Sequence, residues 1–245
     1  MAMLARGGFL PVITPTLMGV GFILVGWFVN PLYGLAPGLG VLMLMLAAFF
    51  ANFWRDPDRP IPRDEGVIVS PADGHVMFAK RERATGRRPS KEEMVNAEED
   101  EHTGSWHPEP CEEILSFSTE QRFEAVPPGE ESDTDVWRIA VFMSPLDVHV
   151  NRSPIAGKIT RMEHRTGKGL RRGPFLPAFR KESEYNERVR TLFQRADGLI
   201  VEVMQISGAL ARTIIPWTSE GDDMRRGERF GMIRLGSRVD VRVPA

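Results

Sequence analysis

The first 54 residues form the most apolar part of the chain. No charged side chain occurs from residue 7 to residue 54, a span of 48 residues. A membrane-spanning helix needs about 20 apolar residues, so this span can hold two, which we place at about Phe9–Val29 and Leu35–Phe53. Proline and glycine in residues 30–34 indicate a turn between them. The pattern therefore predicts a two-helix membrane hairpin over residues 1–54.

Basic residues flank this apolar span. Arg6 precedes it, and Arg55, Arg59 and Arg63 follow it. Because basic residues favour the cytoplasmic side of a membrane, both ends of the hairpin are expected in the cytoplasm. The rest of the chain then lies on the cytoplasmic side of the cell (inner) membrane. A cleaved signal peptide fits poorly, since its apolar region is usually about 7–15 residues. A shallower, re-entrant hairpin stays open as an alternative.

Beyond the hairpin, the pattern changes to short apolar runs separated by turn residues, which is typical of a β-rich domain. Clear strand-like runs are Val136–Met143, Leu199–Gly208 and the two halves of residues 228–241. A strand, turn and strand are predicted at residues 66–79, where Asp-Gly supplies the turn. We therefore expect a compact, β-rich sandwich over residues 55–245.

Two charged stretches interrupt the strand pattern. Residues 81–113 hold ten acidic and five basic side chains, a composition that favours a solvated insertion over a core. Residues 158–181 hold eight basic side chains and one acidic one, which fits a surface facing anionic lipid. The whole chain has a net charge of −2, which gives no global sign of nucleic-acid binding. Cys111, the only cysteine, excludes an internal disulfide and a multi-cysteine zinc site.

The pair Gly236-Ser237 carries candidate chemistry nine residues from the C-terminus. Glycine adopts backbone conformations closed to other residues, and the Ser237 hydroxyl lies within reach of the Gly236 carbonyl. Its attack would turn the peptide bond into an ester. Loss of the Ser237 Cα proton would then break the chain and leave a dehydroalanine, which hydrolyses to a pyruvoyl group. The dipeptide alone equally fits an ordinary turn between two strands.

Several motifs together resemble the phosphatidylserine decarboxylases in their short prokaryotic form. They are the proline-rich segment Phe53–Pro62, the run Ser70-Pro71-Ala72-Asp73-Gly74, Ser144–Pro154 around His149, the loop Gly173–Phe179 with Asn186-Glu187-Arg188, and Arg229–Asp240 around Gly236-Ser237. The resemblance covers the chain from about Phe53 to its C-terminus. It implies a barrel-sandwich-hybrid-like β fold.

The resemblance also implies the chemistry. Self-cleavage between Gly236 and Ser237 would give a large chain, 1–236, and a small chain, 237–245. A covalent pyruvoyl group made from Ser237 would form a Schiff base with the serine amine of phosphatidylserine and accept electrons as carbon dioxide leaves. Neither pyridoxal phosphate nor a metal is needed. The product is phosphatidylethanolamine.

Roles for further residues follow from the resemblance. His149 is expected to act as the base in cleavage and as the acid in decarboxylation, with Asp73 orienting and stabilising it. Longer family members have a second histidine where this chain has Arg152. Either His149 therefore serves both steps, or Arg152 supplies charge stabilisation in one of them. The lipid substrate is expected to contact Phe175, Leu176, Pro177, Phe179 and Arg152.

The implied partners are the phospholipid substrate, the membrane and the two self-derived chains, with no nucleic acid; a homo-oligomer is compatible with the sequence. Two other functions stay open. One is the same chemistry on another serine lipid, such as archaetidylserine. The other is a non-catalytic, membrane-tethered, carrier-like domain, which would remain one uncut chain. A serine hydrolase is disfavoured because Ser237 lacks the Gly-X-Ser-X-Gly motif.

Overall fold

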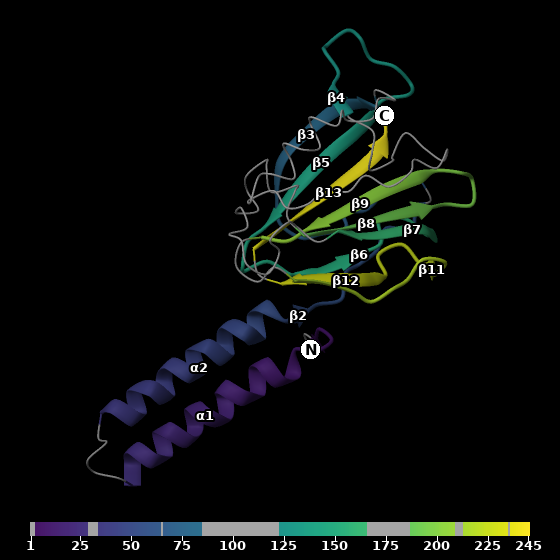
Figure 1. Cartoon of the computed structure of the whole chain (residues 1–245). Helices are drawn as coiled ribbons and strands as arrows, with labels where there is room; N and C mark the ends of the chain where they lie inside the picture. Colours follow the sequence, from purple (N-terminus) through teal and green to yellow (C-terminus); the bar gives the residue numbers. More distant parts are fainter. Residues whose placement is uncertain are drawn as a thin grey trace. The chain divides into compact units, whose positions relative to one another are not determined.

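The computed structural model describes residues 3–28, 34–64, 66–84, 123–165, 187–208, 213–234 and 236–245. The chain divides into two compact units, Met1–Pro60 and Ile61–Ala245. Figure 1 shows the helices in the first unit and most of the strands in the second.

The first unit is a helical hairpin, as the apolar span predicts. Its helices are α1 (Phe9–Phe28) and α2 (Leu35–Phe53), and the short strands β1 (Met3–Leu4) and β2 (Arg55–Asp56) pair beside them. A Cβ atom added at Gly19 would lie 2.9 Å from the Gly40 carbonyl oxygen, so small residues let the helix backbones approach closely. Both helices are long and apolar enough to cross a bilayer.

The second unit is built from antiparallel strands in two sheets. One has eight strands in the order β11-β7-β8-β9-β13-β5-β3-β4, and the other has three in the order β10-β12-β6. Their bounds are β3 (His75–Ala84), β4 (Phe123–Ala125), β5 (Val136–Met143), β6 (Val150–Arg152), β7 (Gly157–Arg165), β8 (Arg188–Gln194), β9 (Ile200–Ile206), β10 (Thr213–Pro216), β11 (Asp223–Met224), β12 (Arg229–Arg234) and β13 (Ser237–Pro244). This confirms the predicted fold class, a β-rich domain with an N-terminal two-helix hairpin. The described strands do not close into a barrel.

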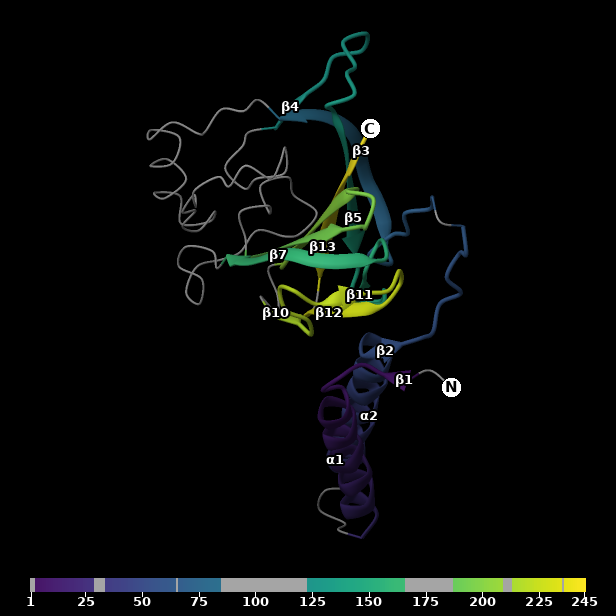
Figure 2. The ribbon, with the colours of Figure 1, turned by 90° about the vertical axis from the view of Figure 1, so that its right-hand side faces the viewer.

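The hydrophobic core lies between the two sheets (Figure 2). Side chains along a strand alternate between its faces, and on β13 the buried Val239 and Val241 join this core. From the smaller sheet, Phe230 meets Phe193 of β8 edge to face, with the ring centroids 5.3 Å apart. We call this side of the larger sheet its inward face and the opposite side its outward face.

Two segments differ from the sequence-based expectation. The strand expected before Asp73 does not form: residues 66–74 are irregular, and Pro71 lacks an N–H to donate. The charged insertion was expected to begin at Arg81, but β3 continues to Ala84. Glu82 is buried there because Arg138 and Arg242 pair with its carboxylate. The part of the insertion from residue 85 to residue 113 lies outside the described residues.

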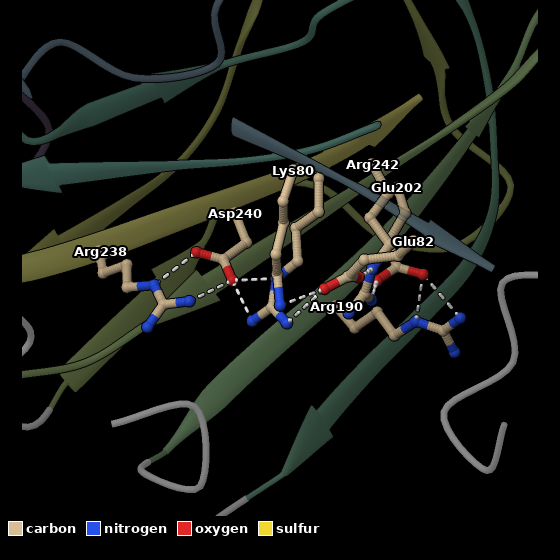
Figure 3. A network of polar contacts seen from close by, with 8 residues as sticks. Lys80, Glu82, Arg190, Glu202, Arg238, Asp240 and Arg242 are labelled. Carbon is tan, nitrogen blue, oxygen red and sulfur yellow. Dashed lines mark hydrogen bonds and ion pairs between the residues drawn. The ribbon is translucent and has the colours of Figure 1, made fainter. Parts of the chain in front are cut away.

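The outward face carries a chain of buried ion pairs, drawn in Figure 3. Its strongest contacts join Arg238 Nε to Asp240 Oδ1 (2.6 Å), Arg138 Nε to Asp240 Oδ2 (2.8 Å), Arg242 Nη1 to Glu202 Oε1 (2.6 Å) and Arg190 Nη2 to Glu202 Oε2 (2.8 Å). Glu82 connects the two halves, at 3.5 Å from Arg138 and 3.3 Å from Arg242. These seven residues are at most 8% exposed. The pairs therefore join β13 to β5, β3 and β9, and Glu202 extends the connection to β8.

Glu202 shows how this network depends on paired charge. Burial acts to raise the pKa of its carboxyl group, but Arg190 and Arg242 together hold that pKa below its ordinary value of 4.5. A carboxyl group with a lowered folded-state pKa stabilises the fold above the unfolded-state pKa, and this contribution is lost as the pH falls through the folded-state value.

We expect Glu202→Gln to lower the free energy of unfolding near pH 7 by about 3 kcal/mol, the lower end of the cost of breaking a buried ion pair. It removes the closest counter-charge of Arg190 and Arg242, which keep the longer contacts with Glu163 (3.7 Å) and Glu82 (3.3 Å). The difference from the wild type should narrow as the pH falls below about 4.5, because the unfolded chain takes up the Glu202 proton there whereas the folded chain takes it up only at lower pH. Urea unfolding of the full chain in detergent, followed across this pH range, measures both effects. Glu228→Gln, which alters an exposed pair with Arg225, is the control and should cost less than about 1 kcal/mol. A difference in unfolding free energy between the wild type and Glu202→Gln that does not vary with pH would contradict a stabilising charge on Glu202.

Candidate active site

The Gly236-Ser237 junction lies where several strands end. Ser237, the first residue of β13, is the Cα partner of Met143, the last residue of β5. Phe142 is in turn the partner of His75, the first residue of β3. β12 ends just before the junction, so the chain passes here from the smaller sheet into the larger one. We call this place the strand corner.

The backbone conformation of Gly236 and the burial of Ser237 suit an attack of the Ser237 hydroxyl on the Gly236 carbonyl. Gly236 has a φ of +65°, in the left-handed region that favours glycine. Ser237 is fully buried, and its Oγ lies 3.9 Å from the sulfur of Met143. A thioether is a weak acceptor, so this contact holds the hydroxyl only weakly.

His149 lies next to β6 and reaches the end of β12. It is fully buried, and its carbonyl oxygen accepts from the Ile233 N–H at 3.2 Å. Its ring Nδ1 lies 2.9 Å from the Asp147 carbonyl oxygen. A carbonyl oxygen can only accept, so Nδ1 carries the proton in the neutral ring and Nε2 is the basic nitrogen. This tautomer suits the role of a base.

The loop that carries Asp73 is docked at the same corner. The Pro71 carbonyl oxygen accepts from the Arg152 N–H at 2.9 Å, which ties the loop to β6. Gly74 has a φ of +146°, and a Cβ atom there would lie 2.2 Å from the Phe142 carbonyl oxygen. Only glycine fits this position, and it sets the half-buried Asp73 beside the end of β5. Asp73 and Ser237 thus lie near the same end of β5, and His149 lies beside the end of β12, while their roles stay predictions.

Other predicted site residues lie elsewhere. The Arg152 guanidinium donates from Nη1 to the Gly227 carbonyl oxygen at 3.1 Å. Its Cα partner is Arg229, at the start of β12, whereas the junction follows the end of that strand. A role for Arg152 at the substrate therefore stays a prediction. Phe175, Leu176, Pro177 and Phe179 lie outside the described residues.

The sequence analysis missed two buried carboxamides near Ser237, Asn151 on β6 and Gln205 on β9. Both are fully buried, and Gln205 Nε2 donates to Asn151 Oδ1 at 2.8 Å. The sequence could have indicated Gln205, because the alternation of side chains along a strand places it on the same face as the apolar Val201 and Val203. A polar residue at such a position indicates either a buried network or a site.

The chain combines a hairpin of two helices that are long and apolar enough to cross a bilayer with a separate strand-rich unit that buries a serine at the strand corner. These features are compatible with a membrane-associated enzyme. The chain belongs to the phosphatidylserine decarboxylase family, whose model matches residues 46–245, and it is therefore a decarboxylase. This confirms the resemblance seen in the sequence motifs.

Individual relatives agree with the family match. A phosphatidylserine decarboxylase proenzyme of Erythrobacter litoralis is 38% identical over 204 residues, which cover 83% of this chain and 67% of that protein. The proenzyme of Streptomyces coelicolor is 37% identical over 211 residues, covering 86% and 70%. That of Symbiobacterium thermophilum is 35% identical over 229 residues, covering 90% and 83%.

Proposed function

We propose that this protein converts phosphatidylserine to phosphatidylethanolamine with a pyruvoyl group that it makes from Ser237 by breaking its own bond to Gly236. The observation that carries the proposal is the strand corner. It holds a buried serine directly after a left-handed glycine, with Asp73 near the same end of β5 and His149 beside the end of β12. The relatives named above, each a decarboxylase proenzyme, agree with a chain that must be processed.

Self-cleavage uses only groups of this chain. His149 Nε2 takes the Ser237 hydroxyl proton as Oγ bonds to the Gly236 carbonyl carbon, following the logic of an activated serine nucleophile. The bond from that carbon to the Ser237 nitrogen then breaks, and the nitrogen receives the proton. Asp73 orients the imidazole and stabilises its charged form. Removal of the Ser237 Cα proton next expels the Gly236 carboxylate and leaves a dehydroalanine at the start of chain 237–245. The dehydroalanine then takes up one water molecule and releases ammonia to become the pyruvoyl group.

The surroundings of Ser237 fit a small carbonyl group at that position. Before cleavage, bulk water is largely kept from Ser237, since Ser237 and its neighbours Met143, Asn151 and Gln205 are fully buried. When formed, the pyruvoyl group supplies an electron sink for the carbanion left by decarboxylation. His149 is the group we expect to return a proton to the substrate carbon.

The small chain, residues 237–245, is held without a covalent link. It forms β13, which lies between β9 and β5 in the larger sheet. Val239 and Val241 anchor its inward face in the core, and Arg238, Asp240 and Arg242 join its outward face to the ion pairs. We therefore expect the two chains to stay together after cleavage.

The membrane supplies the substrate. The two apolar helices fit an anchor in the bilayer that holds phosphatidylserine, and the basic residues at both ends of the hairpin favour the cytoplasmic side. Arg152 and the loop residues Phe175, Leu176, Pro177 and Phe179 remain our proposed lipid contacts.

Denaturing mass spectrometry of the purified protein tests the proposal. We expect two polypeptides, residues 1–236 and 237–245. The small one should lack a free α-amino group and should react with phenylhydrazine through its terminal carbonyl. The same preparation should convert phosphatidylserine to phosphatidylethanolamine in mixed micelles. An active preparation that consists of one intact chain would contradict the proposed mechanism.

A further inference from the structure

The inward face of the larger sheet is mostly apolar, and its polar side chains include Thr191 on β8 and a group near Ser237. Ser237 shares this face with Val239 and Val241, because side chains two residues apart on a strand point the same way. Gln205 is the Cα partner of Val239 on the neighbouring strand β9. Asn151 reaches the same place from β6, in the smaller sheet, and contacts the sulfur of Met143. The interior beside the junction therefore holds two carboxamides in a mostly apolar core.

The hydrogen bond between the carboxamides fixes how Asn151 is turned. Gln205 Nε2 donates to Asn151 Oδ1 at 2.8 Å, so the acceptor side of Asn151 is occupied and its NH₂ group points elsewhere. Gly231 on β12 provides the room: a Cβ atom there would lie 3.1 Å from Gln205 Nε2. Gln205 is thus packed so that it orients Asn151.

Among the described residues, the NH₂ group of Asn151 makes two weak contacts. It lies 3.4 Å from the Pro71 carbonyl oxygen and 3.8 Å from the sulfur of Met143, and thioethers accept weakly. The Ser237 Oγ contacts the same sulfur atom at 3.9 Å. A buried amide donor that lacks a good acceptor costs free energy, so its retention next to the reactive hydroxyl calls for a function.

We propose that Asn151 is a further catalytic residue of self-cleavage, oriented by Gln205 as a positioning residue. Its NH₂ group donates to the Gly236 carbonyl oxygen as Ser237 Oγ adds to the carbonyl carbon. That oxygen gains negative charge when the C–O bond forms and loses it when the bond to the Ser237 nitrogen breaks. A fixed donor in a buried, mostly apolar interior is effective at this moment, because little water competes for the oxygen. The inference rests on the proposed self-cleavage.

The test follows cleavage of freshly synthesised full-length chain over time, by gel and by intact mass. Asn151→Leu keeps a similar volume and removes the donor, and Asn151→Asp keeps the shape without an N–H. Both should slow the appearance of chain 1–236 by about 10²–10³-fold, the usual effect of losing one oxyanion donor. Gln205→Leu should slow it by about 10-fold, since Asn151 keeps its donor but loses its orientation.

Thr191→Val is the matched control. Thr191 is fully buried on β8, on the inward face with Val189 and Phe193, and its hydroxyl has no hydrogen-bond partner within the described part of the chain. This substitution removes a buried polar group that lies away from Ser237, so cleavage should keep the wild-type rate.

Hydroxylamine separates the proposed step from the later elimination, because it splits the ester intermediate but not a peptide bond. If Asn151 acts in ester formation, hydroxylamine will not accelerate cleavage of the slow Asn151 variants. Accumulation of a hydroxylamine-sensitive ester in Asn151→Leu would overturn the inference, as would a wild-type rate in both Asn151 variants. Should Asn151→Leu not fold, Asn151→Asp still tests the loss of about 10²–10³-fold, and Gln205→Leu tests the smaller loss of about 10-fold. A wild-type chain that stays intact would instead refute the proposed function.

Discussion

Replacing Ser237 with alanine is expected to leave one uncut, inactive chain of 245 residues. The lost hydroxyl is both the nucleophile of self-cleavage and the origin of the carbonyl group used in decarboxylation. The fold should survive, since Ser237 Oγ contacts the weakly accepting sulfur of Met143, and a hydrogen bond contributes only about 0.5–1.5 kcal/mol net. Intact mass, phenylhydrazine reactivity and lipid turnover measure the three consequences. Decarboxylation at the wild-type rate by Ser237→Ala would exclude a Ser237-derived group.

Ser153→Ala is a matched control for this variant. Ser153 is also a fully buried serine, but its hydroxyl donates to the Ile155 carbonyl oxygen at 2.7 Å. This substitution should cost about 1 kcal/mol of stability and leave cleavage between Gly236 and Ser237 intact. The pair of variants separates loss of the reactive hydroxyl from loss of a buried serine.

Replacing His149 with alanine should slow self-cleavage by about 10²–10⁴-fold, the usual range for loss of a general base. The Nδ1 contact with the Asp147 carbonyl oxygen leaves Nε2 as the basic nitrogen. Arginine at position 152 stays protonated at working pH and is a poor proton shuttle. One imidazole is therefore expected to serve both cleavage and decarboxylation.

The second role of His149 is tested on the fraction of His149→Ala that cleaves after long incubation. Phenylhydrazine first confirms that its carbonyl group is present, and carbon dioxide release is then measured. We expect release at least about 10²-fold below the wild type. Arg152→Ala is the comparison and should lower activity without abolishing cleavage. Normal release from cleaved His149→Ala would remove His149 from the decarboxylation step.

The sequence by itself determined the elements whose signal is local. An uncharged span of 48 residues strongly favours apolar helices, and α2 begins and ends where it was predicted. The strand Val136–Met143 and the two terminal strands were also predicted, because apolar runs between turn residues report strands without knowledge of their partners. The Gly236-Ser237 candidate came from its chemistry and from the family motif.

Only the tertiary structure decided how charge is distributed. Glu82 is a charged residue of the kind found on solvated surfaces, so the composition of the region from residue 81 onward predicted a solvated insertion. Arg238 is likewise charged and yet buried. Strand pairing places these residues on one face with Asp240 and Arg242, where opposite charges offset the cost of burial. Sequence cannot show this pairing, since Glu82 and Arg242 are 160 positions apart.

The strand corner is also decided only by the tertiary structure. Asp73, His149 and Ser237 are far apart along the chain. The register of β5 with β3 and β13 brings the ends of those strands together, and the hydrogen bond from the Ile233 N–H to the His149 carbonyl oxygen ties His149 to the end of β12. Asn151 and Gln205 likewise meet only because β6 packs against the inward face. Local patterns specify which residues form strands, whereas the contacts that build a site depend on strand order and register, which are set by long-range packing.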